Sequence, residues 1–370
     1  MDEKLRLCDE FAKITDSDSA VSRRYLAENG WEMERALNSF FEHDMEKVFE
    51  VVDSPEKERG PAVKKKKQSH TPQGGCKPER DVSKNNVSSI DLTTDEPACS
   101  TSHADAGKTT KQKAPVDDQK LSLISWNVDG LDTDNLAERA RGLCSYLVLY
   151  TPDVVFLQEL IPPYVEYLKK RAVSYTLVEG GEDGYFTGMM LKKSRVTLLG
   201  SQIVPYTTTQ MMRNLLIAQV TFQGQQLSLM TSHLESCKGQ AAERMKQLRL
   251  ITQKMRETPD NVTVLFGGDT NLRDTEVSLV VGLPSGVLDV WEKLGRQEHC
   301  RYTWDTKANS NKKLPYTSRL RFDRVYLRPA SREGVPRLKP DHMALLGLEK
   351  LDCGRYTSDH WGVYCSFSAG

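Results

Sequence analysis

Five short motifs rich in acids, amides and histidine occur in order along the C-terminal two thirds of the chain. They read SWNVDG at 125–130, LQE at 157–159, TSHLE at 231–235, GGDTN at 267–271 and SDHW at 358–361. Hydrolysis of a phosphate ester needs a hard cation, a base for the attacking water and hydrogen-bond donors around a charged transition state. Carboxylate oxygens are ligands that Mg²⁺ prefers. The set therefore indicates metal-dependent hydrolysis of a phosphate ester.

Each motif alone is weak evidence for that chemistry. Ser-Asp-His is commonly a capped turn, Gly-Gly-Asp is a common turn, and an acid after a strand is often a helix cap. What favours a shared site is the complete set, in order, within a strand-rich region of about 250 residues.

From residue 120 onward, short apolar strands alternate with helical stretches. Helices are predicted at 136–149, 164–171 and 241–256. Strands are predicted at 121–128, 153–159, 185–191, 215–222, 226–234, 263–269, 322–327 and 361–367. Because many strands are joined by links of hairpin length, we expect no doubly wound parallel sheet. The pattern favours an α/β fold, a four-layer sandwich of two mixed β-sheets flanked by helices.

The motifs lie at or just beyond strand ends, where side chains from different strands can converge. The period-two alternation of a strand predicts that Asn127 and Asp129 lie on the same face. Glu159 ends an apolar strand, and a carboxylate at a buried edge is costly unless it binds a cation or a donor. The glycines at 267–268 are expected to let the backbone approach a ligand closely.

In order and spacing, these motifs resemble the endonuclease/exonuclease/phosphatase superfamily. The resemblance implies that Glu159 is the main metal ligand, with Asp129 and the catalytic amide of Asn127 in its neighbourhood. Asp359 would support the metal side. The implied cofactor is Mg²⁺, with Mn²⁺ as a substitute, and whether the site uses one ion or two stays open.

The remaining motif residues would act on the water and the phosphate. By the same resemblance, Asp269 positions or deprotonates the attacking water, and Asn271 donates to the phosphoryl oxygens. His360, oriented by Asp323, would contact the phosphate and stabilise charge. His233 matches a position that is histidine in several branches of the superfamily, so it too is expected to contact the phosphate.

A finer resemblance narrows the substrate. TQMMRNL at 209–215, GGDTNLRD at 267–274 and LEKLDCGR at 348–355 resemble the 5′-tyrosyl-DNA phosphodiesterases. The resemblance implies a DNA repair enzyme that hydrolyses the bond between a topoisomerase II tyrosine and a DNA 5′ phosphate, leaving that phosphate for end joining. Its partners would be DNA 5′ ends that carry a tyrosyl or peptide adduct, including topoisomerase II adducts.

A single-stranded 5′ end of this kind needs aromatic surface for stacking and cations for its phosphates. The candidates are Tyr185 and Trp304 for stacking, and Arg213, Arg244 and Arg273 for the phosphates. Ordinary packing stays open as an alternative, above all for Tyr185, which opens an apolar strand, and for Arg244, which lies on a predicted helix. The stretch 309–321 departs from the small apolar residues expected to line a DNA groove.

A small helical domain is predicted over residues 1–50, in three short runs of apolar residues at helical spacing. Its predicted core residues are Leu5, Leu7, Phe11 and Ile14 in the first run, Val21, Tyr25 and Leu26 in the second, and Ala36, Leu37, Phe40 and Phe41 in the third. The turn NGW at 29–31 and the helix after it resemble ubiquitin-associated (UBA) domains. Ubiquitin binding and a purely structural bundle, with Trp31 in its core, both stay open.

The catalytic domain is expected to span 120–370, after a linker over 51–119. The linker is polar and has almost no aromatic residues, so it is predicted to be disordered. KKKK at 64–67 is either a nuclear import signal or solvated charge. SIDLTTDE at 89–96 resembles a SUMO-interacting motif, in which a short apolar strand adds to a sheet edge, although polar linkers also produce this pattern by chance.

Composition bounds the remaining possibilities. The 370 residues carry a formal net charge of zero, and the eight cysteines show no metal-binding or redox spacing. No apolar run reaches the length that spans a bilayer. We therefore expect a soluble, intracellular protein with no membrane partner, and the resemblance to DNA repair enzymes implies the nucleus and also the cytoplasm. Two alternatives stay open: a broader Mg²⁺ nuclease or abasic-site endonuclease, and a ubiquitin- or SUMO-binding adaptor with an inactive nuclease-like domain.

Overall fold

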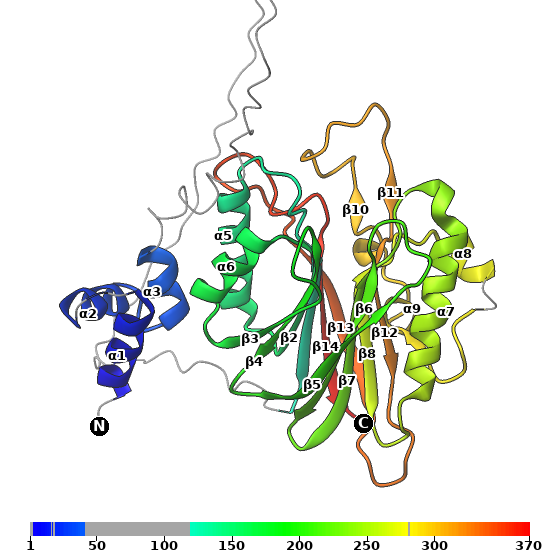
Figure 1. Ribbon diagram of the computed structural model, residues 1–370, viewed down its shortest axis with the longest axis horizontal. Helices are drawn as coiled ribbons and strands as arrows, with labels where there is room; N and C mark the ends of the chain where they lie inside the picture. Colours follow the sequence, from blue (N-terminus) through cyan, green and yellow to red (C-terminus); the bar gives the residue numbers. More distant parts are fainter. Residues whose placement is uncertain (1–2, 16, 18, 41–118, 280–281) are drawn as a thin grey trace, which may run out of the picture. The chain divides into compact units, whose positions relative to one another are not determined.

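The computed structural model describes residues 3–15, 17, 19–40, 119–279 and 282–370 (Figure 1). These residues form an N-terminal group of helices and a large C-terminal domain. The basic run at 64–67, the SUMO-like segment at 89–96 and all but the last residue of the predicted linker lie outside the described residues.

Three helices form the N-terminal group, as the apolar spacing predicts. They are α1 (Glu3–Thr15), α2 (Ser19–Glu28) and α3 (Met33–Phe40). Phe11, Leu26 and Leu37 are fully buried where the three helices meet. The prediction for Leu5 is wrong, because that side chain is 54% exposed and the buried stripe of α1 begins one turn later, at Cys8. The predicted core residue Phe41 lies outside the described residues.

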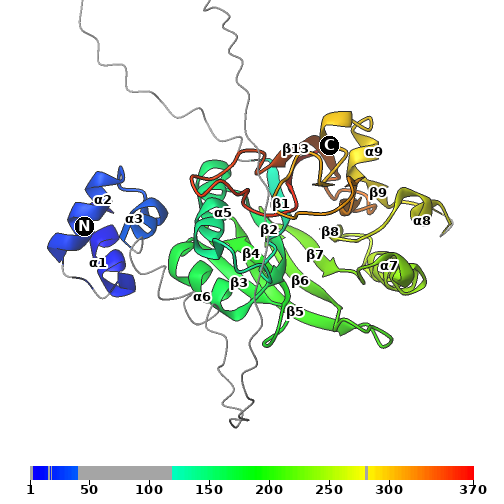
Figure 2. The same cartoon turned by 90° about the horizontal axis from the view of Figure 1, so that it is seen from above.

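The C-terminal domain is built on two mixed sheets (Figures 1 and 2). The first contains, in spatial order, β13 (Leu338–Leu346), β14 (Gly362–Ala369), β1 (Leu121–Asn127), β2 (Val154–Leu160), β4 (Phe186–Lys192) and β3 (Tyr175–Glu179). The second contains β5 (Val196–Pro205), β6 (Asn214–Phe222), β7 (Gln225–His233), β8 (Thr263–Asp269), β12 (Asp323–Arg328) and β9 (Leu288–Asp289). A separate small pair joins β10 (Trp304–Asp305) to β11 (Arg319–Leu320).

Each sheet has a parallel pair near its centre, and antiparallel neighbours surround it. β1 runs parallel to β2, and β7 runs parallel to β8. The crossover helices of these pairs are α5 (Leu136–Tyr150) and α7 (Ala241–Glu257). Because the carboxyl ends of parallel strands meet at one edge of a sheet, each pair brings two strand ends together.

The apolar residues separate into three layers of core. Inner faces of the two sheets pack on each other through residues such as Phe156 and Leu265. The outer face of the first sheet is covered by α5 and α6 (Pro162–Arg171), and that of the second by α7. The shorter helices are α8 (Asp274–Leu279), α9 (Val290–Lys293), η2 (Lys238–Gln240) and η3 (Glu298–Cys300). The predicted four-layer sandwich is confirmed.

All predicted strands and helices of this domain form, and each end lies within two residues of the predicted one. The strands that the apolar pattern missed are β3, β5, β9, β10, β11 and β13. None of the helices in the described part of the chain has the length and apolar character that a membrane crossing requires.

Candidate active site

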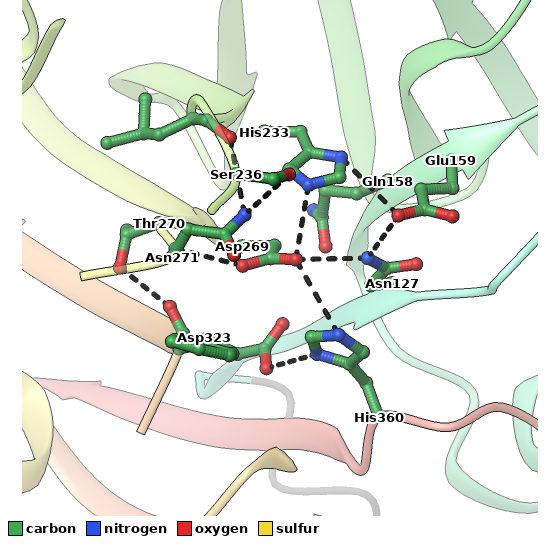
Figure 3. A network of polar contacts seen from close by, with 12 residues as sticks. Asn127, Gln158, Glu159, His233, Ser236, Asp269, Thr270, Asn271, Asp323 and His360 are labelled. Carbon is green, nitrogen blue, oxygen red and sulfur yellow. Dashed lines mark hydrogen bonds and ion pairs between the residues drawn. The ribbon is translucent and has the colours of Figure 1, made fainter. Parts of the chain in front are cut away.

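The motif side chains converge at one edge of the sandwich, where the two parallel pairs end. Asn127, His233 and Asp269 are the last residues of β1, β7 and β8. Asp323 is the first residue of β12 and lies opposite Asp269 in the antiparallel register. His360 lies just before β14, so residues from both sheets face one another (Figure 3).

Asp269 is the centre of the polar network. Its Oδ2 accepts from Nδ2 of Asn127 at 3.0 Å and lies 3.3 Å from Nε2 of His233. Nε2 of His360 lies 3.7 Å from the same oxygen, and the backbone N–H of Asn271 donates to Oδ1 at 3.0 Å. Burial raises the pKa of Asp269 to about 6, although the charge of His360 and these hydrogen bonds oppose the rise.

The two histidines differ in charge. Burial alone would lower the pKa of His360, but the charges of Asp323 and Asp269 outweigh it and raise that pKa well above the ordinary value. Nδ1 of His360 is 2.8 Å from Oδ2 of Asp323, which holds the ring as the sequence predicts. His360 is therefore an imidazolium at neutral pH.

His233 is the neutral partner. Burial and the nearby Arg213 guanidinium lower its pKa well below the ordinary value. Nη1 of Arg213 lies 3.0 Å from Nδ1 of His233 and can only donate, so the ring proton is on Nε2 and points to Asp269. Arg213 thus fixes the tautomer with which His233 holds Asp269.

A second group of acids lies on the other side of Asn127. Nδ2 of Asn127 also donates to Oε1 of Glu159 at 3.1 Å. Burial, and then the charge of Asp359, raises the pKa of Asp129 to about 7, and the same two causes raise the pKa of Glu159 against the hydrogen bond from Asn127. The charge of Asp359 thus acts on both Asp129 and Glu159.

The backbone that carries these groups is unusual. Asp129, Glu159 and Asn271 have positive φ angles of 51°, 59° and 50°. β1 ends at Asn127, so strand alternation does not place Asp129, whose N–H instead donates to Oδ1 of Asn127 at 2.9 Å. A register shift between Leu157 and Leu160 turns Glu159 into the site. Such local strain persists where the surroundings fix it, and it is common at functional sites.

The donor sets decide where a metal ion fits. Asp269, Asp323 and His360 offer ligand atoms within 4.8 Å of one another. A protonated His360 cannot ligate a cation, however, and Asp323 is its hydrogen-bond partner. Glu159, with Asp129 and Asp359 nearby, offers oxygen atoms only, and a cation there would offset the burial and the charge of Asp359 that raise the pKa values of Glu159 and Asp129. The acid cluster at Glu159 is therefore the one that fits a hard metal ion.

The candidates for substrate contact lie in three settings. Arg213 lies over the Tyr185 ring at 4.7 Å. Trp304 packs on Phe322, with 5.6 Å between ring centroids, and its indole N–H donates to Oδ2 of Asp359 at 3.1 Å. The guanidinium of Arg273 lies 5.3 Å from the centre of the Phe322 ring. Arg213 and Tyr185 thus lie beside His233, while Trp304 and Arg273 pack on Phe322, whose ring is 6.4 Å from that of His360.

Arg244 has the packing role that the sequence left open as an alternative, and it is not placed to contact DNA. The side chain has no exposed surface. Its guanidinium donates to Oε1 and Oε2 of Glu276 at 2.7 and 3.2 Å and to the carbonyls of 235–237. Glu276 also accepts from the N–H of Arg273. Arg244 therefore ties α7 and the loop after β7 to α8, and its buried guanidinium is not accessible to a phosphate.

Sequence reasoning missed two polar residues in the site. Oγ of Ser236 accepts from Nη2 of Arg213 at 3.1 Å and lies 3.4 Å from Nδ2 of Asn271, which also donates to the carbonyl of Leu234 at 3.3 Å. Lys312 contacts Asp129 from a loop between β10 and β11. Ser236 directly follows the third motif, and this position is the only feature of the sequence that could have indicated it. No feature of the sequence indicated Lys312.

The comparisons with known proteins agree with this geometry. A model of the endonuclease/exonuclease/phosphatase family matches residues 124–360, and a model of the UBA-like domain matches residues 6–47. The fold and the site thus define a hydrolase of the endonuclease/exonuclease/phosphatase class with a UBA-like domain at its N-terminus, and both predictions are confirmed.

Relatives place the chain more narrowly. It is 62% identical to tyrosyl-DNA phosphodiesterase 2 of Danio rerio over 370 residues, covering 99% of this chain and 98% of the relative. The Homo sapiens relative of that name is 49% identical over 360 residues, covering 97% of this chain and 91% of the relative. A crystal structure of the D. rerio protein, complexed with a single-strand DNA product, has 73% identity and a TM-score of 0.66, over 67% of this chain and 99% of that one. The chain belongs to the tyrosyl-DNA phosphodiesterase 2 family and is a DNA repair phosphodiesterase.

Proposed function

We propose that the chain hydrolyses the 5′-phosphotyrosyl bond that topoisomerase II leaves on DNA, with Mg²⁺ as the cofactor. The observation that carries the proposal is one carboxylate, Asp269, held by Asn127, neutral His233 and the Asn271 backbone, with the cationic His360 beside it. This arrangement can orient and deprotonate a water next to a phosphate whose charge is neutralised on both sides.

Each residue has a role that follows from its position. Asp269 accepts the proton of the attacking water, and its raised pKa makes it a better base than an ordinary aspartate. Protonated His360 stabilises negative charge on the phosphoryl oxygens. Glu159, with Asp359 and Asp129, would hold the Mg²⁺ ion, which supplies charge neutralisation for the phosphate and the leaving tyrosyl oxygen. The amide of Asn127 joins the metal side of the site to the base, because it donates to both Glu159 and Asp269.

The substrate follows from the relatives and from the chemistry of the rim. The similar proteins are tyrosyl-DNA phosphodiesterases, and one of them binds a single-strand DNA product. Arg213 over Tyr185, and Trp304 with Arg273 around Phe322, supply the cation and aromatic surfaces that a single-stranded 5′ end needs. A DNA substrate of this kind implies work in the nucleus.

Two oligonucleotides separate this function from its nearest rival. A duplex with a 5′-phosphotyrosyl end and a duplex with an internal abasic site are incubated with the protein and Mg²⁺. Tyrosine release with an intact 5′ phosphate is expected from the first, and no strand cleavage from the second. Cleavage of the abasic duplex alone would show that the protein is an abasic-site endonuclease.

The N-terminal helices add a binding function to the proposal. The UBA-like domain supports ubiquitin binding, and the segment at 89–96 supports contact with SUMO. An adaptor with an inactive catalytic domain is the less favoured reading, because Asn127, Glu159, Asp269 and His360 are all in place and mutually oriented. Mixing ubiquitin chains with the intact protein and measuring the binding tests this part.

A further inference from the structure

Lys312 reaches the metal side of the site from a loop that belongs to no catalytic motif. Its Nζ lies 3.0 Å from Oδ1 and 2.9 Å from Oδ2 of Asp129, and 2.8 Å from Oδ2 of Asp132. The loop connects β10 to β11, so the lysine is distant in sequence from both acids. Asp129 is thereby paired with a cation of the chain itself.

The loop that carries Lys312 is fixed to the segment before β14. Nδ2 of Asn309 donates to the carbonyl of Ser358 at 2.8 Å. Nδ2 of Asn311 donates to the carbonyl of Tyr356 at 2.9 Å, and the N–H of Tyr356 donates back to Oδ1 of Asn311 at 2.9 Å. Lys312 follows directly, so its backbone is held in place. This anchoring reduces the entropy that a surface lysine loses when it forms an ion pair.

A second cation continues the pairing on the outer side. Nη2 of Arg355 lies 2.7 Å from Oδ2 of Asp132, the oxygen that Lys312 also contacts. The Lys312 side chain is 34% exposed and the Asp129 side chain only 6%, so the ammonium lies between solvent and the buried acid. It therefore lies on the solvent side of Asp129, one of the carboxylates that would hold a metal ion.

We propose that Lys312 is a built-in counter-ion of the metal-side carboxylates, which weakens divalent-ion binding by the DNA-free protein. This inference rests on the proposed metal site at Glu159. The ammonium satisfies Asp129 and repels an incoming divalent ion by charge. Removing one unit charge several ångströms from a divalent ion in a partly solvated site changes the ion's affinity by about threefold to tenfold.

Direct ion binding tests the inference without reference to catalysis. Mg²⁺ binding is measured by calorimetry, and Mn²⁺ binding by the electron paramagnetic resonance signal of the free ion, on the full chain without DNA. Lys312→Met is expected to bind both ions about threefold to tenfold more tightly than the natural chain. Lys312→Arg keeps the charge and should bind them within about twofold of the natural chain. The matched control is Lys313→Met, which removes the same charge from the exposed neighbouring position.

The outcomes separate this inference from the proposed function. Tighter binding by Lys312→Met, with Lys313→Met unchanged, supports the counter-ion role. Equal or weaker binding by a folded Lys312→Met overturns the counter-ion role. The proposed metal site still stands in that case if the natural chain binds the ions and Glu159→Gln does not. If neither the natural chain nor Lys312→Met binds either ion, both the metal site and the counter-ion role fail. Thermal unfolding of each variant checks that it is folded.

Discussion

Opposite charges are held close together around Asp269, and their protonation follows from burial and from the neighbouring charges. Asp269 is 2% exposed and Asp323 is fully buried, yet the charged imidazolium of His360 lies between them. The buried His233 is instead neutral, because burial and the nearby charge of Arg213 both lower its pKa. One base, one acid and one neutral donor therefore share a single small network.

Asp269→Asn should remove the base while retaining the shape of the site. We expect the rate of phosphotyrosyl hydrolysis to fall by at least about two to three orders of magnitude, because the water loses its proton acceptor. Single-turnover kinetics and thermal unfolding measure the loss and the integrity of the fold. Asp352→Asn, a change of the same type at an exposed position, is the control. Full activity of Asp269→Asn would mean that another group is the base.

The raised pKa of Asp269 predicts an acid limb in the pH profile. A carboxyl group with a pKa of about 6 is protonated, and unable to act as a base, below that pH. His360 stays protonated through neutral pH because its pKa is raised, so it sets only the alkaline limb. We expect kcat/KM to be about tenfold lower at about pH 5 than on its plateau. A rate that is constant from pH 5 to pH 8 would contradict this assignment.

The sequence predicts which residue types meet in the site, but not how their backbones turn. Asn127, Asp269 and Asp323 occupy strand ends, which apolar patterns locate well. Asp129 and Glu159 reach the site through left-handed φ angles, and in Glu159 through a register shift. Left-handed conformation in non-glycine residues depends on tertiary contacts, so neighbouring residues in sequence do not reveal it.

Among the elements, β7 and β8 explain the glycines of the fourth motif. We expected them to allow close approach to a ligand, but a Cβ on Gly268 would lie 2.1 Å from the carbonyl oxygen of Ser232 in β7. A Cβ on Gly267 would lie 2.7 Å from the Phe156 ring. These glycines therefore allow strand-to-strand and sheet-to-sheet packing, which brings Asp269 beside His233.

Gly268→Ala should destabilise the domain and displace Asp269. The clash is with backbone, which cannot rotate away, so we expect a loss of about 2–3 kcal/mol in the free energy of unfolding. Urea denaturation measures it. Gly200→Ala in β5, where an added Cβ meets nothing within 4 Å, should stay close to the natural chain. Equal stability of the two variants would remove the packing explanation.

The strands that sequence patterns missed within the two large sheets are the edge strands. β13 and β3 border the first sheet, and β5 and β9 border the second. β5 is largely exposed, β9 has two residues, and β13 contains Pro340 at a register shift. An edge strand buries less and pairs on one side only, so it does not need the strong apolar alternation of a central strand.

At the scale of the whole molecule, the catalytic chemistry belongs to the C-terminal domain. The D. rerio crystal structure with a DNA product corresponds to 67% of this chain. The motif residues all lie between Asn127 and His360, outside the UBA-like match at 6–47. Binding of ubiquitin and hydrolysis of DNA adducts should therefore be separable.

Removing residues 1–119 should separate the two functions. The remaining domain is expected to hydrolyse a short phosphotyrosyl oligonucleotide at a rate within about twofold of the full chain, because its core and site are complete. Binding of ubiquitin chains should be lost. Steady-state kinetics and a ubiquitin pull-down, each with full chain and truncated chain side by side, measure both. A truncated chain that is folded but inactive would place part of the site in the N-terminal residues.

The limits of sequence reasoning are clearest at this scale. Motif order indicates a metal-dependent phosphohydrolase because the chemistry requires those residue types. The substrate came only from resemblance, because candidate phosphate contacts such as Arg213 and Arg244 look alike in sequence. Both are buried, but Arg213 contacts His233 and Tyr185 at the site, whereas Arg244 is bound to Glu276 and to the carbonyl of Glu235.

Mg²⁺-dependent tyrosine release tests the central claim most directly. Single-turnover release from a 5′-phosphotyrosyl oligonucleotide is measured against Mg²⁺ concentration for the natural chain and for Glu159→Gln. We predict no release in the presence of a chelator, full recovery on adding Mg²⁺, and a requirement for at least about tenfold more Mg²⁺ in the variant. Release at the full rate in chelator, or the same Mg²⁺ dependence in both proteins, would contradict a metal-assisted reaction at Glu159.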